Sequence, residues 1–217
     1  MLTNKELTQF LKQTSVNLSF IDKLKVYYRP LVCPLNTLLS YLKPGEKVFD
    51  IGCGSGQFSL LVAHYCKPKK IFGIEISQTL VTNARALLHP YRETLDYTFE
   101  YFDGITIPDA INEYDTIFMI DVVHHIPKDG QRAFIKQLYE KMSPGSRLII
   151  KDINAASPLV YFNKFHDLVF AREIGNEWTK QNMLTLLSDL NLTITLYNET
   201  RTLLYPHYTI IAQKEPV

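Results

Sequence analysis

A glycine-rich turn directly after a short apolar segment limits what this chain can fold into. Residues 47–51 read KVFDI, which has the length and composition of a buried parallel strand, and Gly52, Gly54 and Gly56 follow before the helical pattern of residues 57–66. Glycine has no Cβ, so this order of strand, turn and helix lets the backbone come close to a ligand at the start of the helix. The segment predicts a site for a polar ligand.

Short apolar segments alternate with helical segments through most of the chain. This alternation predicts one α/β domain over residues 1–217, with a Rossmann-like, seven-stranded, mostly parallel sheet and helices on both faces. Residues 192–200 and 205–213 leave no room for a crossover helix, so we expect an antiparallel C-terminal pair. The predicted strands are 47–51, 70–76, 97–102, 114–122, 146–153, 192–200 and 205–213, and the clearest predicted helices are 57–66, 77–88, 130–142 and 178–190.

Two segments fall outside this alternation. Residues 1–43 carry apolar side chains at a spacing of three and four and predict an N-terminal helical cap, broken near Pro30 and Pro34. Residues 154–177 form a long, aromatic-rich insertion after the fifth predicted strand. Connections at this end of an open α/β sheet pass over the ligand crevice, which predicts a lid, while a helix that packs its aromatic stripe into the core is an equal alternative.

Charge and cysteine content limit the partners that the chain can take. Lys and Arg number 23 against 22 Asp and Glu, so no positive surplus is available to neutralise a nucleic-acid backbone. The three cysteines are far apart and form no C-x-x-C pair, which predicts neither a zinc site nor a disulfide framework. No apolar segment approaches the length of a membrane span. We expect a cytoplasmic protein with a small-molecule substrate, no nucleic acid and no bound metal.

The residues around the turn distinguish between nucleotide ligands. A dinucleotide fingerprint G-x-G-x-x-G requires glycine at position 57, where this chain has Gln57, so an NAD site fits poorly. The sequence from Val48 to Gly56, VFDIGCGSG, instead resembles motif I of class I S-adenosylmethionine-dependent methyltransferases. The resemblance implies S-adenosylmethionine as the cofactor and places cofactor-binding residues in the turn, namely Asp50, Gly52, Cys53, Gly54 and Gly56.

The ends of the next two predicted strands supply candidates for the adenosine part of the cofactor. Glu75 ends the second strand about 20 residues beyond the turn, where a carboxylate accepts hydrogen bonds from ribose hydroxyls, and Ile76 follows it. After the third strand, the resemblance places an adenine-binding acid at Asp103, with Phe102 and Gly104 beside it. An Asp-Gly pair is also a common turn former, and that alternative stays open.

The fourth predicted strand runs into Asp121-Val122-Val123-His124-His125, which resembles the methyltransferase motif that borders the transfer site. The resemblance assigns Asp121 to the cofactor site and His124 and His125 to catalysis. A histidine that titrates near neutral pH is suited to take the proton of an acceptor hydroxyl, although a packing role for either histidine is an equal alternative. His166, in the insertion, is a third catalytic candidate.

A further pair of charges, Lys151 and Asp152, ends the fifth predicted strand. Adjacent opposite charges at this position predict a local, solvated ion pair at the rim of the crevice. We therefore do not include either residue among the catalytic candidates.

Taken with the resemblance, these residues predict an enzyme that transfers a methyl group to a small, apolar or aromatic organic acceptor. A nucleic-acid or protein methyltransferase and a noncatalytic cofactor-binding module are the alternatives. The segment after the fourth strand, Asp121 to His124, lacks the Asn/Asp-Pro-Pro-aromatic sequence typical of enzymes that methylate base amines, and motif I shows no degraded position.

Overall fold

The computed structural model describes residues 2–14, 29–161, 164 and 175–216. Their contacts group the chain into two compact units, residues 1–102 and 103–217, which are treated separately below. The prediction of a single domain is not tested by this grouping. Half of the insertion 154–177, namely residues 162–163 and 165–174, lies outside the described residues, and His166 is among them.

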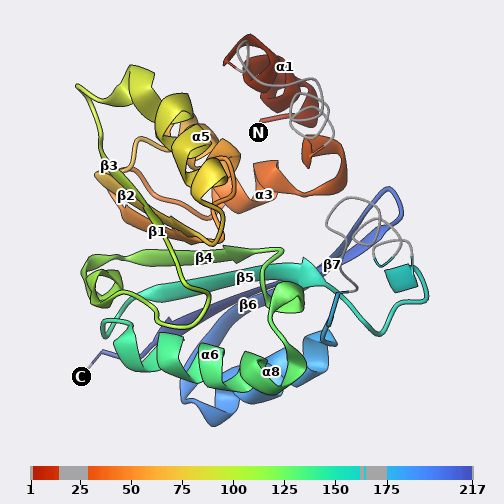
Figure 1. The fold of residues 1–217 in the computed structure, drawn as a ribbon. Coiled ribbons are helices and arrows are strands. Elements are labelled where there is room, and N and C mark those ends of the chain that lie inside the picture. The colour runs from red at the N-terminus through yellow and green to blue at the C-terminus, as the bar shows by residue number, and fades with distance from the viewer. Residues whose placement is uncertain (1, 15–28, 162–163, 165–174, 217) are drawn as a thin grey trace. The chain divides into compact units, whose positions relative to one another are not determined.

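The first unit contains three parallel strands in the order β3-β2-β1 (Figure 1). Its elements are α1 (Asn4–Thr14), α3 (Leu35–Ser40), β1 (Lys47–Ile51), α4 (Gln57–Tyr65), β2 (Lys70–Glu75), α5 (Gln78–Leu88), the short 3-10 helix η1 (His89–Tyr91) and β3 (Asp96–Tyr101). Strands β1 and β2 are buried over all but their first residues, as expected for parallel strands covered on both faces. The Ser77 hydroxyl accepts a hydrogen bond from the Leu80 N–H and caps the N-terminus of α5.

The second unit contains the strand order β4-β5-β7-β6, in which β4 and β5 are parallel and both pairs that include β7 are antiparallel. Its elements are η2 (Asp109–Glu113), β4 (Thr116–Ile120), η3 (Val123–His125), α6 (Lys128–Lys141), β5 (Arg147–Ile153), α8 (Lys180–Asp189), β6 (Leu192–Thr202) and β7 (Tyr205–Lys214). Helices α6 and α8 cover the same face of these strands (Figure 1).

The C-terminal hairpin shows why one strand of the pair is central and the other lies at the edge. Along β6 buried and exposed positions alternate, whereas β7 is buried over most of its length because it is paired on both sides. The two strands meet at a turn formed by Leu203 and Leu204, where Leu203 takes a positive φ of 56°. The predicted antiparallel C-terminal pair is confirmed.

Candidate functional site

The predicted glycine turn is a loop of left-handed backbone between β1 and α4. Gly52, Gly54 and Gly56 have φ values of 68°, 55° and 79°, in a region that side-chain-bearing residues rarely adopt. The loop is fastened to the neighbouring strand, because the N–H groups of Gly52 and Cys53 both donate to the Ile74 carbonyl at 2.8 and 3.1 Å. The three glycines therefore allow the left-handed backbone of this loop.

Two of these glycines differ in what surrounds them. A Cβ on Gly56 would lie 2.9 Å from the Ala84 Cβ and 3.0 Å from the Ala84 Cα, so Gly56 allows α4 to pack closely against α5. Among the described residues other than its chain neighbours, a Cβ on Gly54 would meet a single atom within 4 Å, Arg29 Nη1 at 4.0 Å. Gly54 therefore faces open space, and it is the position at which a ligand can approach the backbone.

Glu75 is tied to this loop through its carboxylate. One oxygen accepts the Gly54 N–H at 2.9 Å and the other accepts the Ser77 N–H at 3.0 Å, while the residue is only 8% exposed. A carboxylate has about four acceptor positions, so these two bonds leave capacity for the ribose hydroxyls that the sequence assigned to it. The ribose role stays a prediction, and the structure adds that Glu75 holds the loop in place.

Asp50, the last acidic residue before the loop, is buried beneath it. Its carboxylate accepts a hydrogen bond from the Ser59 hydroxyl at 2.7 Å, which joins the end of β1 to α4. Burial raises the pKa of the Asp50 carboxyl to about 6, against the opposing effects of the Ser59 bond and the Arg29 charge. Cys53 is also buried, and burial raises the pKa of its thiol, so this cysteine is a packing residue without thiolate character.

The residues after β2 and β3 differ in exposure. Ile76 is 63% exposed although it is apolar, whereas Phe102 is buried and its N–H donates to the Glu75 carbonyl at 2.9 Å. An exposed isoleucine beside the loop is compatible with the predicted adenosine contact. Both assignments stay predictions.

Asp103, at the start of the second unit, forms the turn that the alternative interpretation proposed. Its Oδ1 accepts the N–H groups of Ile105 and Thr106, each at 2.7 Å, and Gly104 takes a φ of 81°. These N–H bonds lower the pKa of the exposed Asp103 carboxyl. The turn-forming role is therefore present, and the adenine-binding role of Asp103 stays a prediction.

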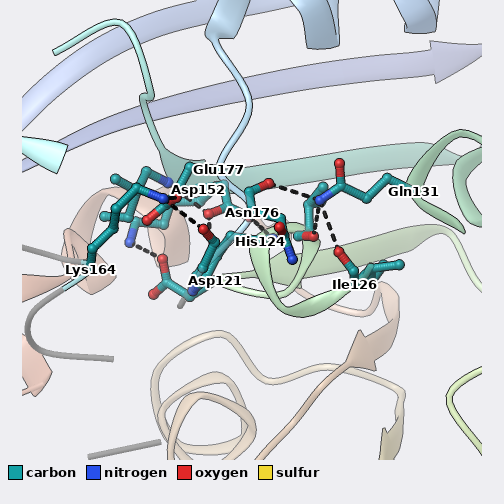
Figure 2. Close-up of polar contacts among 12 residues, drawn as sticks. Asp121, His124, Ile126, Gln131, Asp152, Lys164, Asn176 and Glu177 are labelled. Atoms are coloured by element: carbon teal, nitrogen blue, oxygen red, sulfur yellow. Dashed lines mark hydrogen bonds and ion pairs between the residues drawn. The ribbon is translucent and has the colours of Figure 1, made fainter. Parts of the chain in front are cut away.

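A cluster of four charged or ionisable side chains, here called the polar centre, lies at the ends of β4 and β5. It consists of Asp121, His124, Lys151 and Asp152, of which the last three are buried and Asp121 is 28% exposed. Figure 2 shows Asp121, His124 and Asp152. The His124 Nδ1 lies 2.5 Å from the Asp152 Oδ1, with exposed side-chain fractions of 3% and 2%. The Lys151 Nζ lies 2.5 Å from the Asp121 Oδ1, and the Lys151 side chain is only 1% exposed.

The polar centre overturns the predicted solvated ion pair between Lys151 and Asp152. Successive side chains of a strand point to opposite faces, so these two neighbours face away from each other. Each therefore takes its partner from the segment that follows β4: Lys151 pairs with Asp121 and Asp152 pairs with His124. Both side chains are buried. A charge away from water is tolerated only when it has a partner of opposite charge or a hydrogen bond, and each of the two has one.

His124 is held by its main chain as well as by its ring. Its N–H donates to the Asp152 Oδ2 at 3.3 Å, and its carbonyl accepts the Asn176 N–H at 2.7 Å. The Asp152 Oδ1 also accepts the Ile153 N–H at 2.7 Å. Because a carboxylate in its ionised form only accepts hydrogen bonds, the contact matches the tautomer of His124 that carries its proton on Nδ1.

Gln131 of α6 supports the turn that carries the two histidines. Its Nε2 donates to the carbonyls of Val123, Ile126 and Asn176 at 2.9, 3.0 and 2.8 Å (Figure 2). This single amide therefore joins the histidine turn to the chain that returns from the insertion. His125 differs from His124, because it is exposed, and its ring centroid lies 4.1 Å from that of His124.

Tyr208 lies opposite Asp152 in the register of β5 and β7. Its side chain is fully buried, and its hydroxyl has no hydrogen-bond partner among the described residues. Burial raises the pKa of the Tyr208 hydroxyl well above its ordinary value, with further contributions from the charges of Asp152 and Asp121. The tyrosine thus adds a neutral polar group beside the polar centre.

Sequence reasoning missed four of these residues. Lys151 and Asp152 were assigned to a solvated ion pair, although the strict alternation of side chains along a strand would have separated them. Gln131 and Arg29 carry no motif, and only the folded chain brings Gln131 to three carbonyls and Arg29 to Gly54.

The described residues contain no cluster of three or more His, Cys, Asp or Glu side chains with the geometry of a metal site. Within the same part of the chain, no helix combines the length and apolar character needed to cross a membrane.

Comparisons with known proteins identify the family of the chain. A family model described as a methyltransferase domain matches residues 26–197. An O-methyltransferase of Pyrenophora dematioidea is 30% identical over 110 residues, and the 27-O-demethylrifamycin SV methyltransferase of Amycolatopsis mediterranei is 29% identical over 113 residues. Each alignment covers 51% of this chain and 40% of the relative, so the match spans less than half the length of these proteins.

Solved structures resemble the chain over nearly all of its length. The magnesium protoporphyrin IX methyltransferase of Synechocystis PCC 6803, solved with bound S-adenosylhomocysteine, has a TM-score of 0.71 at 20% identity, and the match covers 94% of this chain and 92% of that one. This likeness concerns the fold. The predicted Rossmann-like, seven-stranded, mostly parallel sheet with an antiparallel end is confirmed.

Proposed function

Since the chain belongs to the methyltransferase-domain family whose model matches residues 26–197, we propose that it transfers the methyl group of S-adenosylmethionine to a hydroxyl of a small, apolar or aromatic organic acceptor. The predicted membership in the class I, S-adenosylmethionine-dependent methyltransferases is confirmed. The observation that carries the proposal is the glycine loop. A ligand can approach the backbone at Gly54, whereas Gly56 allows α4 to pack closely against α5.

The cofactor part of the proposal rests on the glycine loop and Glu75, which would hold the adenosine and sulfonium end. The family resemblance also assigns Ile76, Phe102, Asp103, Gly104 and Asp121 to the cofactor, and these assignments stay predictions. The fit rests on backbone that a Cβ at Gly54 would obstruct and on a carboxylate, Glu75, that is already oriented by two N–H groups. When bound, S-adenosylmethionine supplies an electrophilic methyl carbon on a sulfonium.

The acceptor part of the proposal rests on the pairing of His124 with Asp152. Asp152 would keep the proton on Nδ1, so that His124 Nε2 could take the proton of the acceptor hydroxyl and make its oxygen the nucleophile for an electrophilic methyl group. Asp152 stabilises the imidazolium that forms, as a buried carboxylate does beside a catalytic histidine. His125 and His166 remain the other predicted catalytic candidates.

The choice of a small acceptor rests on charge and on the curated relatives. The chain has 23 basic against 22 acidic residues, so it lacks the basic surplus typical of nucleic-acid-binding proteins. Two relatives carry names that denote an O-methyltransferase and a rifamycin O-methylation step. Among the described residues, no disulfide joins Cys33, Cys53 and Cys66, which suits the reducing cytoplasm that forms part of the proposal.

Two measurements test the proposal. In the first, thermal unfolding of the purified chain is followed with S-adenosylmethionine, S-adenosylhomocysteine and NAD, since a ligand that binds the folded state raises the unfolding temperature. We expect both adenosyl ligands to raise it and NAD to leave it unchanged. Stabilisation by NAD alone would overturn the assignment of the cofactor.

In the second measurement, the transfer of a labelled methyl group is recorded over a panel of phenols, hydroquinones and aliphatic alcohols, with transfer RNA and a mixed-protein extract as separate arms. We expect label in one or more of the small hydroxyl compounds. Label confined to RNA or protein would favour the alternative enzymes. Tight binding of S-adenosylmethionine without transfer to any arm would favour the noncatalytic module.

A further inference from the structure

The side-chain amide of Gln131 lies where three main-chain carbonyls converge. The residue is fully buried, and its Nε2 is within 3.0 Å of the carbonyl oxygens of Val123, Ile126 and Asn176 (Figure 2). An amide nitrogen has two hydrogens, so at least one of them is shared between two carbonyls. If the amide were turned over, its oxygen would face the same carbonyls, so the three acceptors also fix the orientation of the group.

The other end of this amide lacks a hydrogen bond. The Gln131 Oε1 is buried and has no hydrogen-bond partner among the described residues. A buried polar atom without a partner destabilises the fold, and an apolar side chain of similar size would avoid that cost. Such a side chain would offer no donor to the carbonyls, so the three bonds of Nε2 are what a glutamine supplies at this position.

These bonds hold the chain on both sides of His124. Val123 comes directly before the histidine, and Ile126 follows the short helical turn η3 that contains it. Asn176 is bonded twice, because its N–H donates to the His124 carbonyl at 2.7 Å and its own carbonyl accepts from Gln131. The last carbonyls of a helical turn have no partner within the turn, so η3 needs a donor from outside, and Gln131 supplies it.

The place of Gln131 on α6 explains how one side chain reaches this turn. Helix α6 follows η3 almost directly, and the Gln131 N–H donates to the Pro127 carbonyl at 3.1 Å in its first turn. Side chains of a helix lean toward its N-terminus, which here is the direction of the two histidines.

The third carbonyl belongs to a segment that is itself anchored. The Lys164 Nζ donates to the Gly175 carbonyl and to the Glu177 carboxylate, both at 2.7 Å, so it bonds the chain on either side of Asn176 (Figure 2). The Glu177 side chain is only 1% exposed. Gln131 therefore joins the histidine turn to a segment that an ion pair already holds.

We propose that Gln131 is a positioning residue of the methyl transfer, which directs His124 Nε2 toward the acceptor by holding the η3 turn. This inference rests on the proposed function, because it requires His124 to take the proton of the acceptor. Asp152 bonds both the ring and the main-chain N–H of His124, so a displaced turn weakens both contacts at once. Displacement of a reacting group by about 1 Å can slow a reaction on the order of 100-fold.

Gln131→Met tests the inference, because methionine is close to glutamine in size and has no donor. Gln131→Asn keeps the amide on a shorter side chain and is the milder second variant. The matched control is Gln137→Met, since Gln137 lies on the same helix and its Oε1 accepts the Ile107 N–H at 2.7 Å, outside the histidine turn. For each protein we measure kcat and KM with a hydroxyl compound that wild type methylates, and the Kd of S-adenosylmethionine.

We expect Gln131→Met to lower kcat by roughly 10- to 100-fold and to leave the acceptor KM and the cofactor Kd within about threefold of wild type. Gln131→Asn should show a smaller loss of the same kind, and Gln137→Met should stay within about twofold of wild type in all three constants. In a double-mutant cycle, Gln131→Met should slow His124→Ala no further, because a residue that acts through the imidazole has no effect once the imidazole is absent.

A measurement without any acceptor reports on the histidine directly. In protein with isotope-labelled histidine, the proton between His124 Nδ1 and Asp152 gives a magnetic resonance signal that is identified by its absence from His124→Gln. We expect Gln131→Met to shift or broaden this signal and Gln137→Met to leave it unchanged.

The other outcomes overturn the inference in distinguishable ways. If wild type methylates none of the hydroxyl compounds, the proposed function fails and the positioning role fails with it. If wild type is active and Gln131→Met matches Gln137→Met in both kcat and the His124 signal, the function stands and the positioning role is overturned. Losses that add in the double variant would show that Gln131 does not act through His124, which also overturns the inference.

Discussion

The glycine loop and the polar centre are two polar sites made in opposite ways. In the loop, backbone N–H groups supply most of the hydrogen bonds, and they reach carboxylates or carbonyls no more than 22 residues away, as in Gly54 to Glu75 and Gly52 to Ile74. In the polar centre, side chains bond to side chains across 28 to 30 residues and between separate segments.

The two sites are therefore sensitive to different kinds of substitution. A site built from backbone tolerates many changes of side chain and fails when a Cβ enters, because the conformation and the open space belong to glycine. A site built from paired buried side chains tolerates its neighbours and fails when one partner is removed, because the other is then left charged or unsatisfied away from water.

The largest effect on ligand binding is expected from a substitution at Gly54. Gly54→Val places a branched side chain on backbone with a φ of 55° and fills the space in which a ligand approaches, so we expect S-adenosylmethionine binding to become undetectable by calorimetry. Gly45→Val is the matched control, because Gly45 has a φ of 84° and no described atom within 4 Å of its Cβ position, and it lies at the opposite end of β1 from the loop.

The control separates strain from obstruction. Both valines carry a strain of about 1–2 kcal/mol, so both variants should unfold more easily by a similar amount. If Gly45→Val also abolished binding, or if Gly54→Val kept wild-type affinity, the loop would not be the place where the ligand meets the backbone.

The next effect is expected at His124, in the polar centre. His124→Ala should lower turnover of a hydroxyl acceptor by roughly 10²- to 10⁴-fold, the usual contribution of a general base, while the affinity for S-adenosylmethionine changes by less than about threefold. His125→Ala is the matched variant, because the ring of His125 is exposed whereas that of His124 is buried against Asp152. Its turnover is expected to stay within about threefold of wild type.

Single-turnover methyl transfer at saturating cofactor measures this difference. Equal losses in the two variants would remove the distinction between the buried and the exposed histidine. A loss confined to His125→Ala would transfer the role of the base to that residue.

The same contrast explains how much of the molecule the sequence predicts. Strand β1 begins and ends at the predicted residues, and the glycine loop follows as expected, because short-range patterns of apolar residues and glycines determine both. The fourth strand was predicted to reach residue 122 but ends at Ile120, since Asp121 takes a left-handed φ of 58° in order to meet Lys151. Pairings of this kind depend on which strands become neighbours, and no local pattern records them.

Helix boundaries show the same limit on a smaller scale. Helix α6 begins at Lys128, two residues before the predicted start, because Pro127 takes the N-cap position and the Asp129-Gly130 pair, which resembles a turn, is absorbed into the first helical turn. Pro30, expected to break the N-terminal helices, lies within the helical residues 29–32.

A smaller effect is expected at Asp50 and depends on pH. Burial raises the pKa of this carboxyl from its ordinary value of 3.8 to about 6, so the folded state holds its proton over a range in which the unfolded state has lost it. The contribution of Asp50 to the free energy of unfolding is therefore greatest below about pH 4 and falls as the pH rises through about 6, by at most about 3 kcal/mol.

Asp50→Asn removes this titration and keeps an acceptor for Ser59. Urea unfolding of both proteins between pH 4 and 8 should show the stability of wild type falling relative to that of the variant as the pH rises, with little further change above pH 7. Parallel curves over the whole range would mean that the carboxyl is already ionised in the folded protein at pH 4.

The smallest effect is expected from two buried hydroxyls, one from each region. Ser59 donates to Asp50, so Ser59→Ala leaves a buried carboxylate without its partner and should cost about 1–3 kcal/mol in urea unfolding. The Tyr208 hydroxyl has no partner among the described residues. Tyr208→Phe should therefore change the free energy of unfolding by less than about 1 kcal/mol, in either direction. A larger loss would show that the hydroxyl is bonded in solution. Lower turnover with unchanged stability would instead indicate that the Tyr208 hydroxyl contacts the acceptor, because the hydroxyl would then matter for the reaction and not for folding.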